Sequence, residues 1–101
     1  MDYTRLGNSG LKVSRIALGC MSFGDTASGF NEWSLNEHDS APFFQQAVEL
    51  GINFWDTANV YCLGSSEEFV GRAIRKYSRR EDIVLATKVF FKMHDGPGGQ
   101  G

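Results

Sequence analysis

Polar and apolar residues alternate in short runs at the start of the chain. Residues 3–6 and 11–14 are two such runs, and the turn-forming residues 7–10, Gly-Asn-Ser-Gly, separate them. Alternating runs around a glycine-containing turn are typical of a β-hairpin. The apolar segment 15–19 follows, ends in Gly19, and predicts a first buried strand.

Apolar residues next recur at the spacing of a helix face. A cap at Asp39 or Ser40 predicts a helix that runs to about Leu50, with Pro42 in its first turn and Gly51 as its stop. Its expected apolar stripe consists of Phe43, Phe44, Ala47, Val48 and Leu50. The sequence before this helix, residues 20–39, is rich in glycine, serine and asparagine and predicts a long loop without regular structure. Loops of that length are usually functional.

A second helix is predicted after residue 64. Ser65 and Glu68 have the spacing of a capping box, in which each side chain caps a backbone N–H of the first turn. Its expected buried face consists of Phe69, Val70, Ala73, Ile74 and Tyr77.

Two further apolar runs predict strands that alternate with these helices. The first strand covers residues 52–56 and ends at Asp56, and the second covers residues 83–88 and ends at Lys88. Strands alternating with helices indicate right-handed crossovers and a parallel sheet, either open or closed into a barrel. An open dinucleotide-binding sheet should show G-x-G-x-x-G after its first strand, but residues 19–24 read Gly-Cys-Met-Ser-Phe-Gly. A barrel is therefore favoured.

The expected fold class is thus α/β, the N-terminal part of a (β/α)8 barrel with three parallel strands and two helices. The hairpin occupies residues 1–14 and the first βα units residues 15–101 of one domain. Because such a barrel takes about 250 residues, we expect this chain to be a piece of a longer protein. A product of this length alone would expose a strand edge and aggregate.

Composition excludes several classes of function. The chain has 10 basic and 12 acidic residues, a net charge of −2, and no basic block, so neither nucleic acid nor an anionic membrane is an expected partner. It shows no apolar run long enough to span a bilayer and no secretory signal, which favours the cytoplasm. Cys20 and Cys62 lack the spacing of a metal site and are expected to be free thiols.

Candidate chemistry lies at the carboxyl ends of neighbouring strands, where barrels place their working residues. Asp56 and Lys88 each end a strand, and Tyr61 lies in the loop after Asp56. A cation beside a phenol lowers the pKa of that phenol, so Lys88 would make Tyr61 a better general acid, with Asp56 holding Lys88. Taken singly, the three would be a turn residue, a surface aromatic and a solvated lysine. Their joint placement favours a proton-donor site.

Longer motifs make the interpretation specific. Residues 51–61, Gly-Ile-Asn-Phe-Trp-Asp-Thr-Ala-Asn-Val-Tyr, and 64–73, Gly-Ser-Ser-Glu-Glu-Phe-Val-Gly-Arg-Ala, resemble the signature of the aldo-keto reductases. Residues 18–24 and 86–88 are similar to that family's first strand and loop and to its lysine-bearing third strand. The resemblance covers essentially the whole chain and points to the bacterial, potassium-channel-β-subunit-like branch.

The resemblance implies a carbonyl-reducing enzyme that uses NADPH on a small-molecule aldehyde or ketone. Asp56, Tyr61 and Lys88 match three members of the family's catalytic tetrad, and the fourth, a histidine, would lie further along than residue 101. Gly19, Cys20, Met21 and Asp56 are expected to touch the cofactor. His38 and His94 match no tetrad position and are expected at the surface.

Three alternatives stay open on the sequence. The same fold and motifs serve in non-catalytic, cofactor-sensing regulatory subunits, and a truncated, inactive product would carry the same residues. Trp33, with Phe23 and Phe30, would either line a substrate pocket or simply anchor the long loop. The oligomeric state is not indicated.

Overall fold

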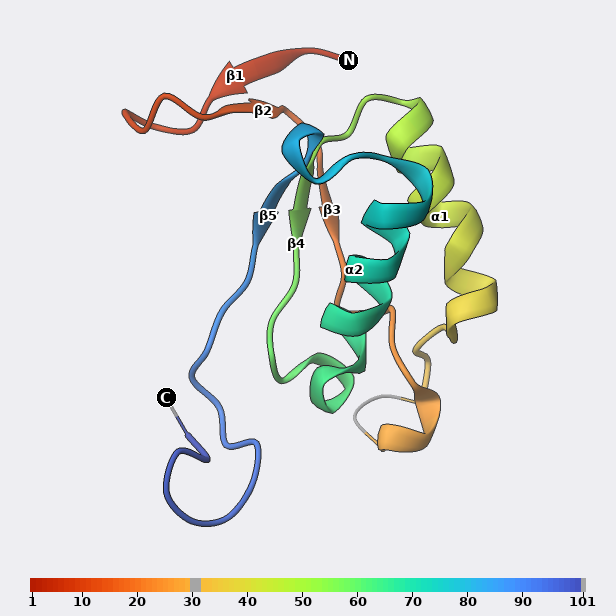
Figure 1. Ribbon diagram of the computed structural model, residues 1–101, viewed down its shortest axis with the longest axis vertical. Coiled ribbons are helices and arrows are strands. Elements are labelled where there is room, and N and C mark those ends of the chain that lie inside the picture. The colour runs from red at the N-terminus through yellow and green to blue at the C-terminus, as the bar shows by residue number, and fades with distance from the viewer. Residues whose placement is uncertain (30–31, 101) are drawn as a thin grey trace.

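A computed structural model describes residues 1–29 and 32–100, and its elements follow the predicted order. They are β1 (Tyr3–Arg5), β2 (Lys12–Ser14), β3 (Ala17–Gly19), α1 (Glu37–Glu49), β4 (Phe54–Asp56), α2 (Ser65–Tyr77) and β5 (Val84–Ala86). Single 3₁₀ turns cover Thr26–Ser28, Tyr61–Gly64 and Arg80–Asp82. In Figure 1 the hairpin lies at the amino-terminal end of the sheet, and both helices pack on one side of it.

The sheet has the order β3-β4-β5, and both pairings are parallel. Its register places Leu18, Trp55 and Leu85 in one row, and all three pack in the hydrophobic core under the helices. Because side chains alternate across a strand, the neighbouring row of Gly19, Asp56 and Ala86 faces the other side of the sheet. The strand pairing therefore sends Asp56 away from the helices.

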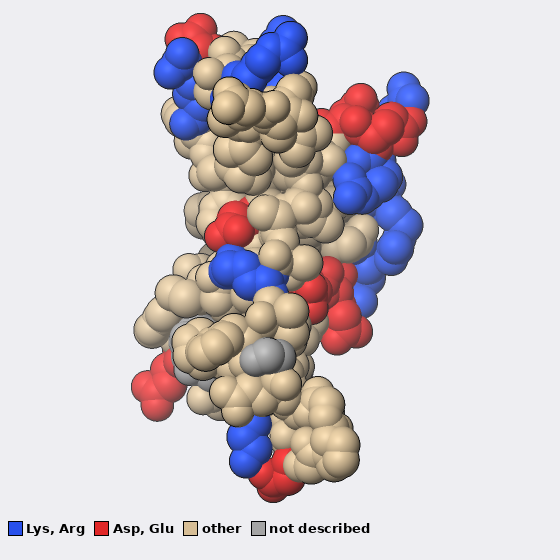
Figure 2. All heavy atoms as spheres, turned by 90° about the vertical axis from the view of Figure 1, so that its left-hand side faces the viewer, with Lys and Arg blue, Asp and Glu red and all other residues tan. Residues whose placement is uncertain are grey.

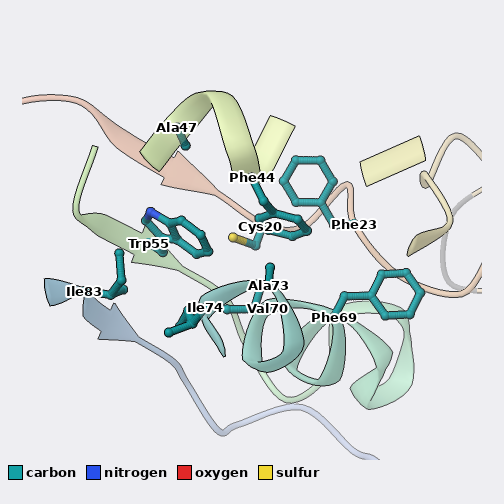
Figure 3. Packing of buried hydrophobic residues seen from close by; sticks show 10 residues of the cluster. All are labelled: Cys20, Phe23, Phe44, Ala47, Trp55, Phe69, Val70, Ala73, Ile74 and Ile83. Atoms are coloured by element: carbon teal, nitrogen blue, oxygen red, sulfur yellow. The ribbon is translucent and has the colours of Figure 1, made fainter. Parts of the chain in front are cut away.

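The hydrophobic core lies between the sheet and the helices α1 and α2 (Figure 3). Trp55 is fully buried at its centre and stacks on Phe44 of α1, with 5.4 Å between the ring centroids. The predicted face of α2 is confirmed, since its first four members are buried and Tyr77 packs against them. The predicted stripe of α1 is only partly correct: Phe44 and Ala47 are buried, but Phe43 and Leu50 are about half exposed.

The start of α1 differs from the prediction. Asn36, rather than Asp39 or Ser40, is the N-cap, and its side chain accepts a hydrogen bond from the Asp39 N–H at 2.9 Å. Pro42 therefore lies inside the helix rather than in its first turn. Ser40 is buried instead, and its hydroxyl donates to the carbonyl of Asn36 at 2.7 Å.

The capping box predicted for α2 is also absent. Gly64 is the N-cap, with no side-chain cap bond, and Ser65 is already the first helical residue. The Ser65 hydroxyl donates to the Cys62 carbonyl instead, at 2.8 Å. The backbone before α2 turns through left-handed conformations at Cys62, Leu63 and Gly64. As a result, α2 begins at Ser65 itself, one residue earlier than the capping box predicted.

Asn53, at the start of the second predicted strand, fastens the hairpin to the sheet. Its Oδ1 accepts from the Ser14 N–H at 2.7 Å, and its Nδ2 donates to the Lys12 carbonyl at 3.1 Å. The Tyr3 hydroxyl adds a bond to the Gly51 carbonyl at 2.7 Å. These bonds hold the predicted hairpin across the amino-terminal end of the sheet.

The long loop is more ordered than predicted. It contains a 3₁₀ turn at Thr26–Ser28 and a β-bridge that pairs Phe23 with Leu35. Phe23 is buried and packs on Phe44, with 4.8 Å between the ring centroids, so it anchors the loop to the core. Trp33 is 57% exposed. Phe30 lies outside the described residues.

Candidate active site

Asp56 and Lys88 meet at the carboxyl ends of β4 and β5. The Lys88 Nζ lies 3.0 Å from each carboxylate oxygen of Asp56 and donates a third bond, of 2.6 Å, to the Thr57 carbonyl. Strand pairing produces this contact, because Asp56 lies opposite Ala86 in the register and Lys88 follows shortly after. The prediction that these two side chains converge is confirmed.

Tyr61 completes the group from the 3₁₀ turn that follows β4. The Lys88 Nζ lies 4.9 Å from the centroid of the Tyr61 ring. Desolvation acts to lower the pKa of Lys88, but hydrogen bonds to Asp56 and Tyr61 and the negative charge of Asp56 outweigh it, so the pKa of Lys88 is raised. The amine is therefore held charged beside the phenol.

The raised pKa of Lys88 sets the upper pH limit of its interaction with Asp56. An amine with a raised folded-state pKa contributes stability fully below its ordinary value, here 10.5, and loses it as the pH rises through the raised value. The amine of Lys88 is thus charged throughout the neutral range. Because both side chains are nearly half exposed, water screens the pair and its contribution to stability is small.

Part of this arrangement has no signal in the sequence. The Thr57 carbonyl is a backbone group, so its bond to Lys88 could not be read from residue types. Thr57 also bonds through its hydroxyl to that of Ser66, at 2.9 Å, and Ser66 bonds to the Cys20 carbonyl at 2.8 Å. This buried network ties β4 to α2 and to the end of β3, and thereby fixes the backbone that presents Asp56.

The residues expected to touch a cofactor differ in their accessibility. Gly19 is exposed at the end of β3, beside Asp56 in the register, and a Cβ built on it would meet nothing within 4 Å. Met21 is 42% exposed. Cys20 is fully buried, and both its backbone N–H and its carbonyl are used in bonds to Asp56 and Ser66. Of these three residues, Gly19 and Met21 offer surface to a ligand.

Cys20 and Cys62 are free thiols, and both are buried. Burial, followed by the negative charge of Asp56, raises the pKa of the Cys20 thiol to about 12. Since only the thiolate attacks, a thiol of that pKa holds roughly 10⁻⁴ of its population in reactive form at pH 8.

We therefore expect Cys20 to stay unmodified by the thiol reagent DTNB in the folded protein and to react fully after unfolding in guanidinium. A Cys20→Ala variant isolates this signal, because it differs from the parent protein by that one thiol. Rapid release from the folded parent of one equivalent of chromophore more than from the variant would contradict the burial of Cys20.

The turn after Tyr61 holds two non-glycine residues in the left-handed region, Cys62 at φ 47° and Leu63 at φ 52°. A side chain in this conformation costs roughly 1 kcal/mol or more per residue. Cys62 is buried, with its sulfur 3.2 Å from the Ser34 hydroxyl, whereas Leu63 is 53% exposed. The strain lies directly beside the candidate proton donor.

Replacing Leu63 by glycine should relieve part of that strain. We expect Leu63→Gly to leave the free energy of unfolding unchanged or to raise it by up to about 1 kcal/mol, because glycine adopts positive φ without penalty. Leu50→Gly is the matched control, since Leu50 is 54% exposed but has φ −80°. That control should lose about 0.5–1 kcal/mol in chemical denaturation. Equal losses in both variants would contradict the strain.

Other candidate groups do not join the site. His38 is exposed on α1, rather than before it as predicted, and His94 is exposed near the end of the chain. Within residues 1–29 and 32–100, no three His, Cys, Asp or Glu side chains gather as they would around a metal ion. The helices in the same described part are too short or too polar to cross a bilayer.

The molecular surface on the side of β5 is mostly uncharged. Figure 2 shows this face with acidic and basic side chains in small, interspersed groups rather than in one large patch of a single sign. The segment after Lys88 adds apolar surface, since Val89, Phe90 and Phe91 are each more than 60% exposed.

Comparison with known proteins extends this picture. The model of the Aldo/keto reductase family matches residues 15–101. The chain is 47% identical over 96 residues to versiconal hemiacetal acetate reductase of Aspergillus parasiticus, covering 94% of this chain and 27% of that protein. It is 40% identical over 88 residues to the aldo-keto reductase YhdN of Bacillus subtilis, covering 87% of this chain and 25% of that protein.

Two solved structures also resemble this chain. The holo form of an aldo-keto reductase from Bacillus halodurans superposes with a TM-score of 0.77 at 39% identity, covering 100% of this chain and 30% of that one. The glycerol dehydrogenase of Gluconobacter oxydans gives a TM-score of 0.60 at 29% identity, with 99% and 29% covered.

This chain therefore spans about a quarter to a third of the length of the proteins that it matches. Its fold is that of the N-terminal part of a (β/α)8 barrel preceded by a β-hairpin. The family model extends over nearly all of the residues that build this fold, and the chain belongs to the aldo/keto reductase family.

Proposed function

We propose that the protein containing this chain is a nicotinamide-dependent oxidoreductase that reduces an aldehyde or ketone to an alcohol, with NADPH as its cofactor. The observation that carries the proposal is the placement of Lys88, with its Nζ bonded to Asp56 and Thr57 and lying 4.9 Å from the Tyr61 ring. Membership of the aldo/keto reductase family supports both the reaction class and the cofactor class.

In this proposal Tyr61 is the general acid. Its hydroxyl donates a proton to the carbonyl oxygen of the substrate as negative charge develops on that oxygen. The charge of Lys88 favours the phenolate that remains, and Asp56 keeps Lys88 charged and oriented. The cofactor, when bound, supplies the hydride that reaches the carbonyl carbon.

Open space beside Gly19 supports a nicotinamide site next to these residues. Gly19 needs no positive φ, and no atom of the described chain occupies the space that a Cβ on it would enter. Neither backbone conformation nor packing within the described chain therefore requires glycine there, which supports close approach of a flat ligand to the end of β3. We propose that the Gly19 backbone, the exposed Met21 and the Asp56 side chain contact the cofactor, with Cys20 serving to pack the strand end.

The proposal is tested by cofactor oxidation in the full-length protein. Purified protein mixed with NADPH and 4-nitrobenzaldehyde should consume the cofactor in proportion to the aldehyde that is reduced, and heat-denatured protein should not. Tight binding of NADPH without turnover on any of a panel of aldehydes and ketones would contradict an enzymatic role and favour the cofactor-sensing alternative.

A further inference from the structure

Gly24, in the long loop after β3, packs tightly against the turn that carries Tyr61. Gly24 is buried, and a Cβ built on it would overlap the Cys62 Cβ and lie 2.5 Å from the Cys62 Sγ and 3.0 Å from the Ser65 Oγ. No residue with a side chain fits there unless the turn moves. The backbone of Gly24 therefore packs directly against the side chain of Cys62, the residue that follows Tyr61.

Ser65 bonds the same two segments together. Its Oγ accepts from the Asp25 N–H at 2.7 Å and donates to the Cys62 carbonyl at 2.8 Å. Its backbone N–H donates to the carbonyls of Cys62 and Tyr61. One residue thus binds the long loop with its side chain and the Tyr61 peptide with its backbone.

The turn depends on these contacts because its own conformation is unfavourable. Cys62 and Leu63 sit at φ 47° and 52°, a region that non-glycine residues hold only when their surroundings impose it. On its other side, the segment before Tyr61 is fixed to the segment that follows β5, since the Asn59 N–H donates to the Lys88 carbonyl at 3.1 Å. The position of Tyr61 relative to Lys88 is therefore set by the Lys88 backbone on one side and by Gly24 and Ser65 on the other.

We propose that Gly24 and Ser65 are positioning residues for Tyr61, which hold its phenol in place through the strained turn at Cys62 and Leu63. Neither residue touches the reacting atoms. The proposal rests on the proposed function of Tyr61 as proton donor. It predicts that the loop after β3 affects proton transfer even where it contacts no substrate.

Steady-state kinetics of the full-length protein test this role. Ser65→Ala removes both side-chain bonds and should lower kcat roughly tenfold while leaving the KM for NADPH unchanged, because small errors in position slow the chemical step. Ser65→Thr keeps the hydroxyl and should restore most of kcat. Gly24→Ala should lower kcat at least as much as Ser65→Ala.

Two controls separate positioning from general destabilisation. Ser14 is a matched serine, because its Oγ also donates to a carbonyl, of Ile16 at 2.6 Å, and accepts from a backbone N–H, of Asn53 at 3.2 Å. It lies at the opposite end of the sheet, so Ser14→Ala should leave kcat within about twofold of the parent. Gly71→Ala is the control for Gly24→Ala, since a Cβ on Gly71 meets nothing within 4 Å. Equal losses of kcat in Ser65→Ala and Ser14→Ala would overturn the proposal.

A readout without turnover separates this proposal from the proposed function. The protein labelled with 3-fluorotyrosine gives a fluorine resonance for each tyrosine, and a Tyr61→Phe variant identifies that of Tyr61. Ser65→Ala and Gly24→Ala should shift or broaden this resonance, whereas Ser14→Ala and Gly71→Ala should not. If the resonance responds but the protein never oxidises NADPH, positioning stands and the proposed function fails. An unchanged Tyr61 resonance in both test variants would refute positioning, whatever the activity.

Discussion

Tyr61→Phe should lower carbonyl turnover by about 10²- to 10⁴-fold, the range that a positioned general acid typically contributes. The substitution removes the hydroxyl and keeps the ring, so the contact between the aromatic face and Lys88 persists. Binding of NADPH should stay within a few-fold of the parent, because Tyr61 acts on the substrate oxygen. The measurements are kcat with a saturating aldehyde, and the cofactor Kd from the quenching of protein fluorescence.

Tyr77→Phe provides the matched control for the loss of a phenolic hydroxyl. Tyr77 ends α2 and packs against the hydrophobic core, away from the carboxyl ends of the strands. Its kcat should match that of the parent protein. If Tyr61→Phe retained full turnover as well, Tyr61 would not be the proton donor, and the proposed mechanism would fall with it.

Trp55→Ala should lower the free energy of unfolding by about 3–5 kcal/mol, the usual cost of truncating a large buried aromatic side chain. Trp55 is fully buried, stacks on Phe44, and donates from its indole N–H to the Ile52 carbonyl at 2.8 Å. Its removal leaves a cavity at the junction of β4 and α1. Urea denaturation of the full-length protein, followed by far-ultraviolet circular dichroism, measures the change.

Trp33→Ala is the matched control, since the chain contains two tryptophans. Trp33 is 57% exposed, and its truncation should change stability by no more than about 0.5 kcal/mol. A loss for Trp55→Ala as small as that for Trp33→Ala would mean that the core is not centred on β4. The fluorescence lost in Trp55→Ala should be blue-shifted relative to that lost in Trp33→Ala, because the indole of Trp55 is buried and that of Trp33 is exposed.

The elements and their order could be predicted because they depend on local patterns. The face of α2 followed from apolar residues at helical spacing, and the parallel sheet followed from strands alternating with helices. The start of α1 could not be predicted in the same way, because Asn36, Asp39 and Ser40 are all good capping residues. The pairing of Phe23 with Leu35 sets the path of the loop and leaves Asn36 at the helix end, and that pairing is a long-range contact.

The contact between Asp56 and Lys88 could be predicted because topology brings neighbouring strand ends together. The Thr57 carbonyl and the left-handed turn at Cys62 and Leu63 could not, since backbone geometry leaves no mark on residue type when the residues are not glycine. The same turn explains the wrong capping box, because it carries Ser65 into α2 and points its hydroxyl at Cys62 and Asp25. The roles of Tyr61, Gly19 and Met21 remain predictions.

The attachment of the hairpin has a consequence for synthesis on the ribosome. Tyr3 bonds to Gly51, 48 residues later, and the bonds of Asn53 reach back 39 and 41 residues to Ser14 and Lys12. At about 5–20 residues per second, the nascent hairpin waits roughly 2–10 s before its docking partners are made. In the structure its two strands form a sheet of their own and pair with no strand of the parallel sheet. The hairpin is therefore made several seconds before the residues that fasten it to the sheet exist.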